Sequence, residues 1–120
     1  MATRESISGS FSSDIIFPSA ARTTSGNSGL LASYGWAHSL LMQVAVTAFS
    51  GTLPTLDVTV QATMDGGINF RDILTFTQVV GIAAETKVYE LPFSDTLRVK
   101  YTIGGTNPSF TFSAMLFAKA

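Results

Sequence analysis

Apolar and polar residues alternate along much of this chain. The alternation is clearest from residue 56 to residue 63, where Leu56, Val58, Val60 and Ala62 are separated by Asp57, Thr59, Gln61 and Thr63. A period of two is typical of a β-strand with one buried face. Similar patterns predict further strands at residues 14–17, 39–49, 70–77, 86–91, 97–103 and 110–116.

Residues 39–49 are the one place where a helix competes with a strand. Both faces of this segment are largely apolar, with Leu40, Met42, Val44, Val46 and Ala48 on one side and Leu41, Gln43, Ala45, Thr47 and Phe49 on the other. The β-branched residues and the polar positions Gln43 and Thr47 favour a long strand.

Glycine and proline separate the predicted strands. Ser50-Gly51 ends the long strand, Asp65-Gly66-Gly67 forms a hairpin turn, and residues 104–108 turn the chain again. Pro18 removes a backbone donor, which limits the first strand to a sheet edge or a strand end. No segment predicts a helix, and no internal repeat is evident.

Seven or eight short strands at spacings of roughly ten residues predict an all-β domain, an antiparallel β-sandwich. Jelly-roll and immunoglobulin-like topologies both remain open, because the pattern does not determine strand order. The length of 120 residues predicts one core. We expect residues 1–13, which are rich in serine, to form an N-terminal arm that orders on docking, and residues 14–120 to form the sandwich domain.

The composition predicts a surface that is partly covered by other subunits. Hydrophobic residues make up 46% of the chain and charged residues only 12%, about half the usual charged share. Some predicted outward rows are also apolar, notably Met115 and Phe117 in the last strand and Leu41, Ala45 and Phe49 in the long strand. A monomeric sandwich places polar residues there, so we expect these rows to be buried between subunits.

Charge and targeting features exclude several classes of function. Seven basic residues are scattered among eight acidic ones, so the chain lacks the basic stripe of a nucleic-acid binder. No apolar run is long enough for a signal peptide or a membrane span, so we expect a soluble protein that is made in the cytoplasm and has no membrane partner. Without cysteine, the fold depends on packing and backbone hydrogen bonds.

No group of residues predicts catalysis, a metal site or a cofactor. His38 is the only histidine, which leaves a triad or a multi-histidine site without partners. Residues 65–69 carry oxygens near glycines, but a hairpin turn explains them better than a calcium loop. The acids Asp57, Asp72, Glu85, Glu90 and Asp95 fall at outward or loop positions, where solvation is their ordinary role. We therefore expect a protein that is not an enzyme.

Tyr34-Gly35-Trp36 is the best candidate for an aromatic platform that stacks on a sugar. A tryptophan that caps the core at the mouth of the sandwich is the competing interpretation.

Several segments resemble small all-β virion-associated proteins of tailed bacteriophages, including head-decoration, or cement, proteins. The resemblance is carried by residues 19–23, 25–29, 55–61, 65–66, 76–78, 97–99 and 103–112. It implies a capsid-surface protein of the virion that binds the major capsid protein and forms a homo-oligomer, with a trimer expected. It also leaves a carbohydrate- or receptor-binding module of a tail or fibre as an alternative.

Candidate contact residues come from the arm, the loops and the outward apolar rows. They are Phe11, Asn27, Tyr34, Trp36, Pro108, Met115 and Phe117.

Overall fold

Two unusually long strands organise the structure. The computed structural model describes residues 11–90 and 96–120, in which the chain forms β1 (Phe11–Arg22), β2 (Gly26–Asn27), β3 (Ser39–Thr63), β4 (Arg71–Thr75), β5 (Ala83–Tyr89) and β6 (Thr96–Lys119). β3 and β6 contain 25 and 24 residues, against about 5–6 in a typical strand. They pair with each other along their length in antiparallel register.

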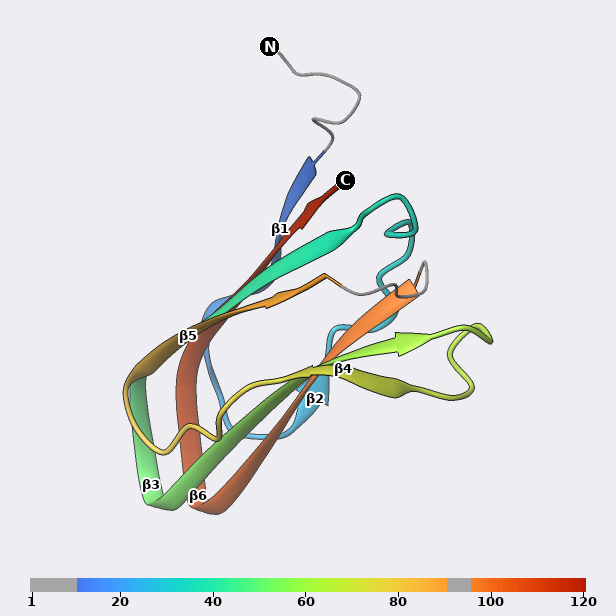
Figure 1. Ribbon diagram of the computed structural model, residues 1–120. Coiled ribbons are helices and arrows are strands. Elements are labelled where there is room, and N and C mark those ends of the chain that lie inside the picture. The colour runs from blue at the N-terminus through green and yellow to red at the C-terminus, as the bar shows by residue number, and fades with distance from the viewer. Residues whose placement is uncertain (1–10, 91–95) are drawn as a thin grey trace.

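Each long strand bends at its middle and so contributes to two layers (Figure 1). In the first layer, the first half of β3 lies between β5 and the second half of β6, and β1 completes the order β1-β6-β3-β5. In the second layer, the remaining halves of β3 and β6 lie between β4 and β2, in the order β2-β6-β3-β4.

This strand order is that of a jelly roll. With the halves of β3 and β6 counted separately, each layer has four antiparallel strands, and the chain changes layer between successive strands except at the hairpin that joins β3 to β4. The predicted antiparallel sandwich is confirmed, and the pairing selects the jelly roll over the immunoglobulin-like topology.

The bend is built from a short internal repeat. Gly51-Thr52-Leu53-Pro54 in β3 lies against Gly105-Thr106-Asn107-Pro108 in β6. Gly51 and Gly105 have φ values of 113° and 111°, and Leu53 and Asn107 have φ values of 49° and 48°. The two halves of the corner therefore have matching backbone conformations.

The glycines allow the two backbones to approach closely. A Cβ atom at Gly51 would lie 2.7 Å from the carbonyl oxygen of Asn107, and a Cβ atom at Gly105 would lie 2.7 Å from the carbonyl oxygen of Leu53. Two predictions were wrong here. Gly51 does not end a strand and residues 104–108 do not turn the chain, because both strands continue through a reciprocal corner, and the corner is formed by an internal repeat where none was expected.

The core lies between the layers and is formed by the inward rows of the long strands. The first half of β3 packs its inward row against the inward row of its second half, and β6 adds the inward rows of both its halves. These buried residues are Leu40, Met42, Val44, Val46, Leu56, Val58 and Val60 of β3 and Leu97, Val99, Phe110, Phe112, Ala114 and Leu116 of β6. These rows were predicted from the alternation. Ala48 was expected inward but is exposed, because the register with β6 slips between Val46 and Ala48.

The peripheral strands differ in extent from the prediction. β1 begins at Phe11, so Phe11, Ser12 and Ser13 belong to a strand and not to the predicted arm. Residues 1–10 of that arm, and Leu91 in the strand predicted at residues 86–91, lie outside the described residues. β1 is an edge strand, as Pro18 predicted, but it continues past the proline through two irregularities in its pairing with β6.

Replacing either corner glycine by alanine should destabilise the fold strongly. A positive φ is unfavourable for any residue with a Cβ, and here the new atom would also meet backbone atoms at less than 3.0 Å. We expect Gly51→Ala and Gly105→Ala each to lower the free energy of unfolding by more than about 1 kcal/mol, measured by urea denaturation.

Gly29→Ala is the matched control for this prediction. Gly29 has a φ of 75°, but apart from its two chain neighbours no residue has an atom within 4 Å of the position of its Cβ. The loss should therefore be smaller at Gly29, and equal losses at the three positions would contradict the close approach at the corner.

Candidate functional site

The described part of the chain contains no cluster of acidic, histidine or cysteine side chains that could hold a metal ion. No three His, Cys, Asp or Glu side chains come together within residues 11–90 and 96–120. His38 is exposed. Asp57 accepts a hydrogen bond from Gln78 Nε2 at 3.1 Å, and Glu85 accepts one from the Thr77 backbone N–H at 2.7 Å. The hydrogen-bond donors to these two acids are thus uncharged groups.

The described residues contain no helix that could cross a membrane.

Asp72 belongs to a network that joins strands. Gln61, which is buried in β3, donates to Asp72 Oδ1 at 2.8 Å and accepts from Arg98 Nε at 3.0 Å. The Arg98 guanidinium also lies 3.5 Å from the centre of the Phe70 ring. Asp72 therefore helps to fix β4 and β6 against β3.

Asp65 forms the hairpin turn that the sequence predicted. Its carboxylate accepts from the backbone N–H groups of Ile68 and Asn69, from Asn69 Nδ2 and from the Thr63 hydroxyl, at 2.8–3.1 Å. The hydrogen bonds from Asn69, followed by the one from Thr63, lower the pKa of Asp65 to about 2. These donors already occupy the carboxylate oxygens that a calcium ion would need.

The turn should loosen only in strong acid. Because the folded pKa of Asp65 lies below its ordinary value of 3.8, the hydrogen bonds are fully present above pH 4 and are lost as the pH falls through about 2. We expect NMR titration of the Asp65 carboxyl carbon to give this pKa, and amide exchange at Ile68 and Asn69 to rise in the same range. The variant Asp65→Asn should abolish the dependence, and a carboxyl pKa near 4 would contradict the geometry.

Tyr34 and Trp36 do not form an exposed aromatic pair. Only 7% of Tyr34 is exposed, and its hydroxyl donates to Asp14 Oδ2 at 2.7 Å. Burial, followed by the hydrogen bond and the negative charge of Asp14, raises the pKa of Tyr34. The prediction that Tyr34 stacks on a sugar is therefore wrong. Trp36 is 39% exposed and is still accessible.

Each of the four strands of the first layer places apolar side chains on its outer face. In β6, Met115 is exposed and Phe117 is half-buried, and their neighbours by register include Ile15 of β1 and Leu41 of β3. Phe11 stacks on Phe117 with ring centres 5.3 Å apart, and Val88 of β5 lies beside Leu41. The outward apolar rows thus lie where the alternation predicted them.

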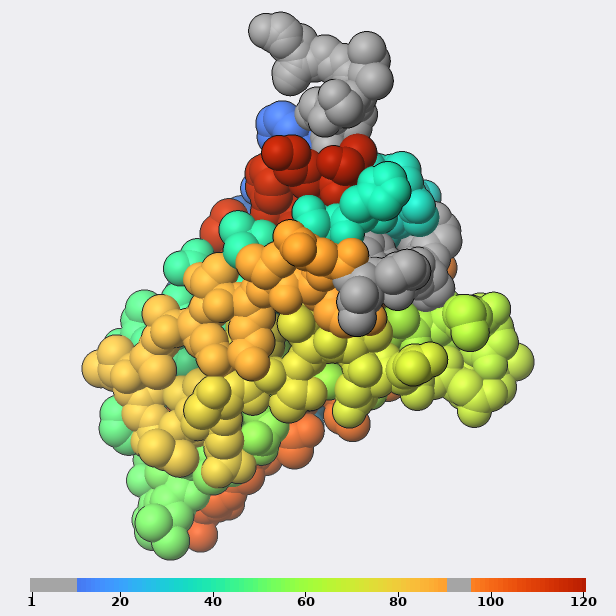
Figure 2. All heavy atoms as spheres, in the orientation of Figure 1, coloured from blue at the N-terminus to red at the C-terminus, as the bar shows by residue number. Residues whose placement is uncertain are grey.

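A second apolar surface surrounds the corner, and we call it the corner patch. Its members are exposed apolar residues of β3 and of the segment before β5, namely Phe49, Leu53, Val80 and Ile82. Figure 2 shows the bend of β3, in green, at the lower tip of the molecule, with the segment that precedes β5 beside it.

The corner patch lies in a region that is almost free of charge. Residues 43–56, 73–84 and 101–118 contain no charged residue. Arg22 is a charged residue of this region, since it lies opposite Phe110 in the pairing of β1 with β6. Its guanidinium donates hydrogen bonds to the carbonyl oxygens of Pro18, Ala20 and Phe112. Pro108 at the corner was among the contact residues predicted from the sequence, whereas Leu53, Val80 and Ile82 were not. The three uncharged segments were the sequence signal that could have identified them as surface contacts.

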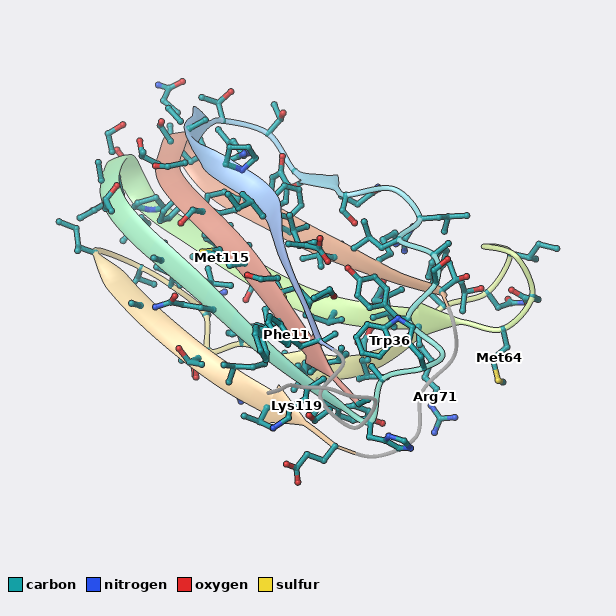
Figure 3. All side chains as sticks on the ribbon, turned by 90° about the horizontal axis from the view of Figure 1, so that it is seen from above. Phe11, Trp36, Met64, Arg71, Met115 and Lys119 are labelled. Carbon is teal, nitrogen blue, oxygen red and sulfur yellow. The ribbon has the colours of Figure 1, made fainter. Side chains whose placement is uncertain are left out.

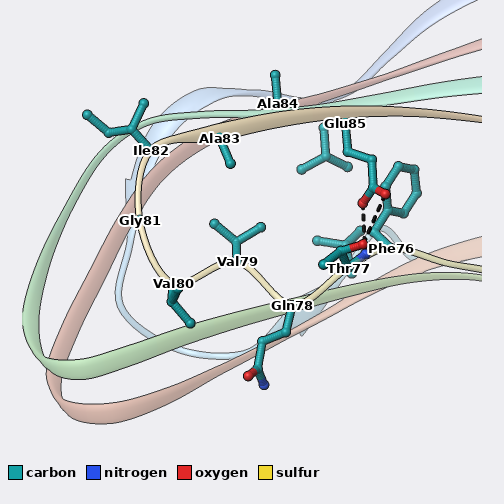
Figure 4. A pocket seen from close by; sticks show the side chains of 12 residues that line it. Phe76, Thr77, Gln78, Val79, Val80, Gly81, Ile82, Ala83, Ala84 and Glu85 are labelled. Atoms are coloured by element: carbon teal, nitrogen blue, oxygen red, sulfur yellow. Dashed lines mark hydrogen bonds between the residues drawn. The ribbon is translucent and has the colours of Figure 1, made fainter.

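A largely apolar cavity of about 440 Å³ opens beside the corner patch, and Thr77, Gln78 and Glu85 supply its polar lining. Val44 and Val58 line it from the two layers, and residues 76–85 arch over it (Figure 4). Val79 points into this arch, whereas Ile82 points away from it. Backbone hydrogen bonds of 2.8 and 2.9 Å between Val79 and Leu56 hold the arch on β3. The cavity can admit an uncharged, apolar group.

The remaining predicted residue, Asn27, lies on β2 and is exposed. Its side-chain oxygen accepts from the Gly29 backbone N–H at 2.7 Å. The structure therefore does not gather the predicted contact residues in one place. Phe11, Met115 and Phe117 share the outer face of the first layer, Pro108 lies at the corner, and Asn27 and Trp36 lie elsewhere.

Comparisons with known proteins show the fold. No protein-family model and no curated protein matches the chain. Among solved structures, the SPBc2 prophage-derived protein YomS has a TM-score of 0.55 at 9% identity, over 97% of this chain and 99% of that one. A protein of the disulfide-linked pili that form Bacillus endospore appendages has a TM-score of 0.53 at 11% identity, over 100% and 96%.

A family 22 carbohydrate-binding module of Clostridium thermocellum Xyn10B has a TM-score of 0.49 at 15% identity, over 88% of this chain and 68% of that one. At 9% and 11% identity, the likeness to the prophage protein and to the pilus protein establishes a shared all-β fold, and no family is assigned.

Proposed function

We propose that this protein is a non-enzymatic structural component of a phage particle, a decoration protein that docks on the outer surface of the head and stabilises it. The sequence resemblance supports the phage setting. The corner patch is the observation that carries the proposal, because exposed apolar residues in a region with few charges are typical of a surface that meets another protein.

The conformation of Leu53 supports a contact role for the patch. Leu53 is 85% exposed and has a φ of 49°, which is unfavourable for leucine. At the equivalent position of β6 the chain has Asn107, a residue type that tolerates positive φ. An exposed leucine adds nothing to the core, so its apolar side chain is better explained by a partner than by folding.

The cavity beside the patch suits the same role. Hot spots of protein interfaces are commonly side chains that fill a desolvated pocket on the partner. An apolar side chain of the major capsid protein could enter between Val79 and the layers, while Leu53 and Ile82 cover the surrounding surface.

Leu53→Asn tests the docking without weakening the fold. We expect the melting temperature to stay the same or rise, because asparagine tolerates the backbone conformation of residue 53 better than leucine. Affinity for heads assembled without this protein should fall at least about tenfold, as expected when a hot-spot side chain is lost. Cosedimentation of heads with the purified protein measures this affinity.

Met64→Asn is the matched control for the docking experiment. Met64 is also an exposed apolar residue, at 87%, but it lies in the turn after β3 and not at the corner. It is labelled in Figure 3, well away from the first layer. Normal binding by Leu53→Asn, or equal losses in both variants, would argue against docking through the corner.

A carbohydrate-binding role in a tail or fibre is the alternative, and the exposure of Trp36 is the observation that favours it. In that case Trp36 would stack on a sugar without Tyr34. A glycan array with the purified protein should then show binding that Trp36→Ala abolishes. If decoration is the function, no glycan should be retained, and Trp36→Ala should bind heads normally.

A further inference from the structure

The two edges of the first layer, β1 and β5, run in opposite directions. Neighbouring strands in the layer are antiparallel, and the order β1-β6-β3-β5 contains an even number of strands. A second copy placed beside the first without rotation would therefore bring its β1 alongside β5 in antiparallel orientation. Figure 3 shows β5 and β1 as the outer strands of this layer.

The edges also match in register. Asp14 is opposite Leu116, Leu116 is opposite Met42, and Met42 is opposite Lys87. These four residues form one row across the layer. A sideways displacement by one layer width would place Lys87 directly beside Asp14 of the next copy, and opposite charges at such a position stabilise an antiparallel pair.

Neither charge is neutralised within the described part of the chain. Lys87 is half-buried on the inner side of β5, and its side chain makes no hydrogen bond or ion pair with residues 11–90 or 96–120. Asp14 is also half-buried and accepts from the hydroxyl groups of Tyr34 and Ser12, at 2.7 and 3.4 Å. A partly buried charge is stabilised by a nearby charge of opposite sign. The β1 edge carries the acid that would pair with Lys87, and the β5 edge carries the base that would pair with Asp14.

We propose that copies of this chain join head-to-tail, with β1 of one copy extending the sheet at β5 of the next and Asp14 pairing with Lys87. An inward-pointing charge on an edge strand normally prevents pairing with other chains. Here the opposite edge carries a matching acid, Asp14. The charge of Lys87 therefore opposes pairing with other chains but favours pairing with a second copy.

The irregularities of β1 limit the joint to part of the strand. The first irregularity lies between Ile15 and Phe17, and Pro18 lacks a backbone donor, so the regular stretch is residues 11–15. With Asp14 opposite Lys87 in an antiparallel pair, residues 11–15 of one copy would lie opposite residues 86–90 of the next. Such an interface is heterologous, so the copies either close into a ring, as in the expected trimer, or extend as a filament. The pairing deepens the proposed function, because a ring would present several corner patches to the head.

Single cysteines test this arrangement, because the chain has none of its own. Ser13 and Val88 are exposed, and each is adjacent in its strand to one member of the proposed ion pair. Under mild oxidation, a mixture of Ser13→Cys and Val88→Cys should form disulfide-linked dimers at least about tenfold faster than either variant alone, because pairing raises the local thiol concentration. The double variant should form a ladder of larger species on a non-reducing gel.

A mixture of Ser13→Cys and Lys100→Cys is the matched control, since Lys100 is exposed on β6 in the second layer. Crosslinking of Ser13→Cys alone at the rate of the Ser13–Val88 mixture would indicate β1 pairing with β1 and would overturn the proposal. Equal rates in the test and control mixtures would also overturn it.

Charge reversal tests the ion pair itself. Lys87→Asp should lower the mass of the assembly in analytical ultracentrifugation, whereas Lys100→Asp should not. Combining Lys87→Asp with Asp14→Lys should restore the assembly, provided that thermal melting shows an intact fold, and equal effects of Lys87→Asp and Lys100→Asp would contradict the pairing. Both experiments use purified protein without heads, so their outcome is independent of whether the corner patch docks on a capsid.

Discussion

The close approach of two backbones at the corner is the constraint on which the rest of this structure depends. Gly51 and Gly105 bring β3 and β6 together at the point where both strands leave one layer and enter the other. Because the strands bend together, their pairing continues on both sides of the corner, and each strand buries one apolar row in each half. One strand pair thus forms the centre of both sheets, and the shorter strands only extend them.

This construction also determines where the surfaces lie. The corner exposes the residues that surround it, so Phe49 and Leu53 come to the surface beside Val80 and Ile82. The centre of the first layer presents Leu41 and Met115 outward, since the opposite faces of the same strands form the core. With 12% charged residues, the chain has few charges to cover these surfaces, and the result is two apolar regions at different places on one domain.

The alternation of residues was sufficient to predict the strands, most of the core and the apolar outward rows, because each depends on a local period of two. The corner was missed because Gly51 and Pro108 are residues of turns as well as of bends, and only pairing partners distant in sequence distinguish these cases. Tyr34 was misplaced for a related reason. Its buried hydroxyl donates a hydrogen bond to Asp14, a partner that lies twenty residues earlier in the chain and that the local pattern does not show. That Asp14 and Lys87 lie in one row on opposite edges of a layer follows only from the strand order and register, which the sequence pattern does not determine.

The central claim is that this protein acts through its surface, with the corner directed at a phage head and the strand edges at its own copies. Cryo-electron microscopy of heads incubated with the purified protein tests this most directly. The account predicts density on the outer shell in which the end carrying Leu53 and Ile82 faces the capsid and β1 of each copy adjoins β5 of its neighbour. Heads that remain undecorated, or decorated heads in which the corner points to solvent, would contradict it.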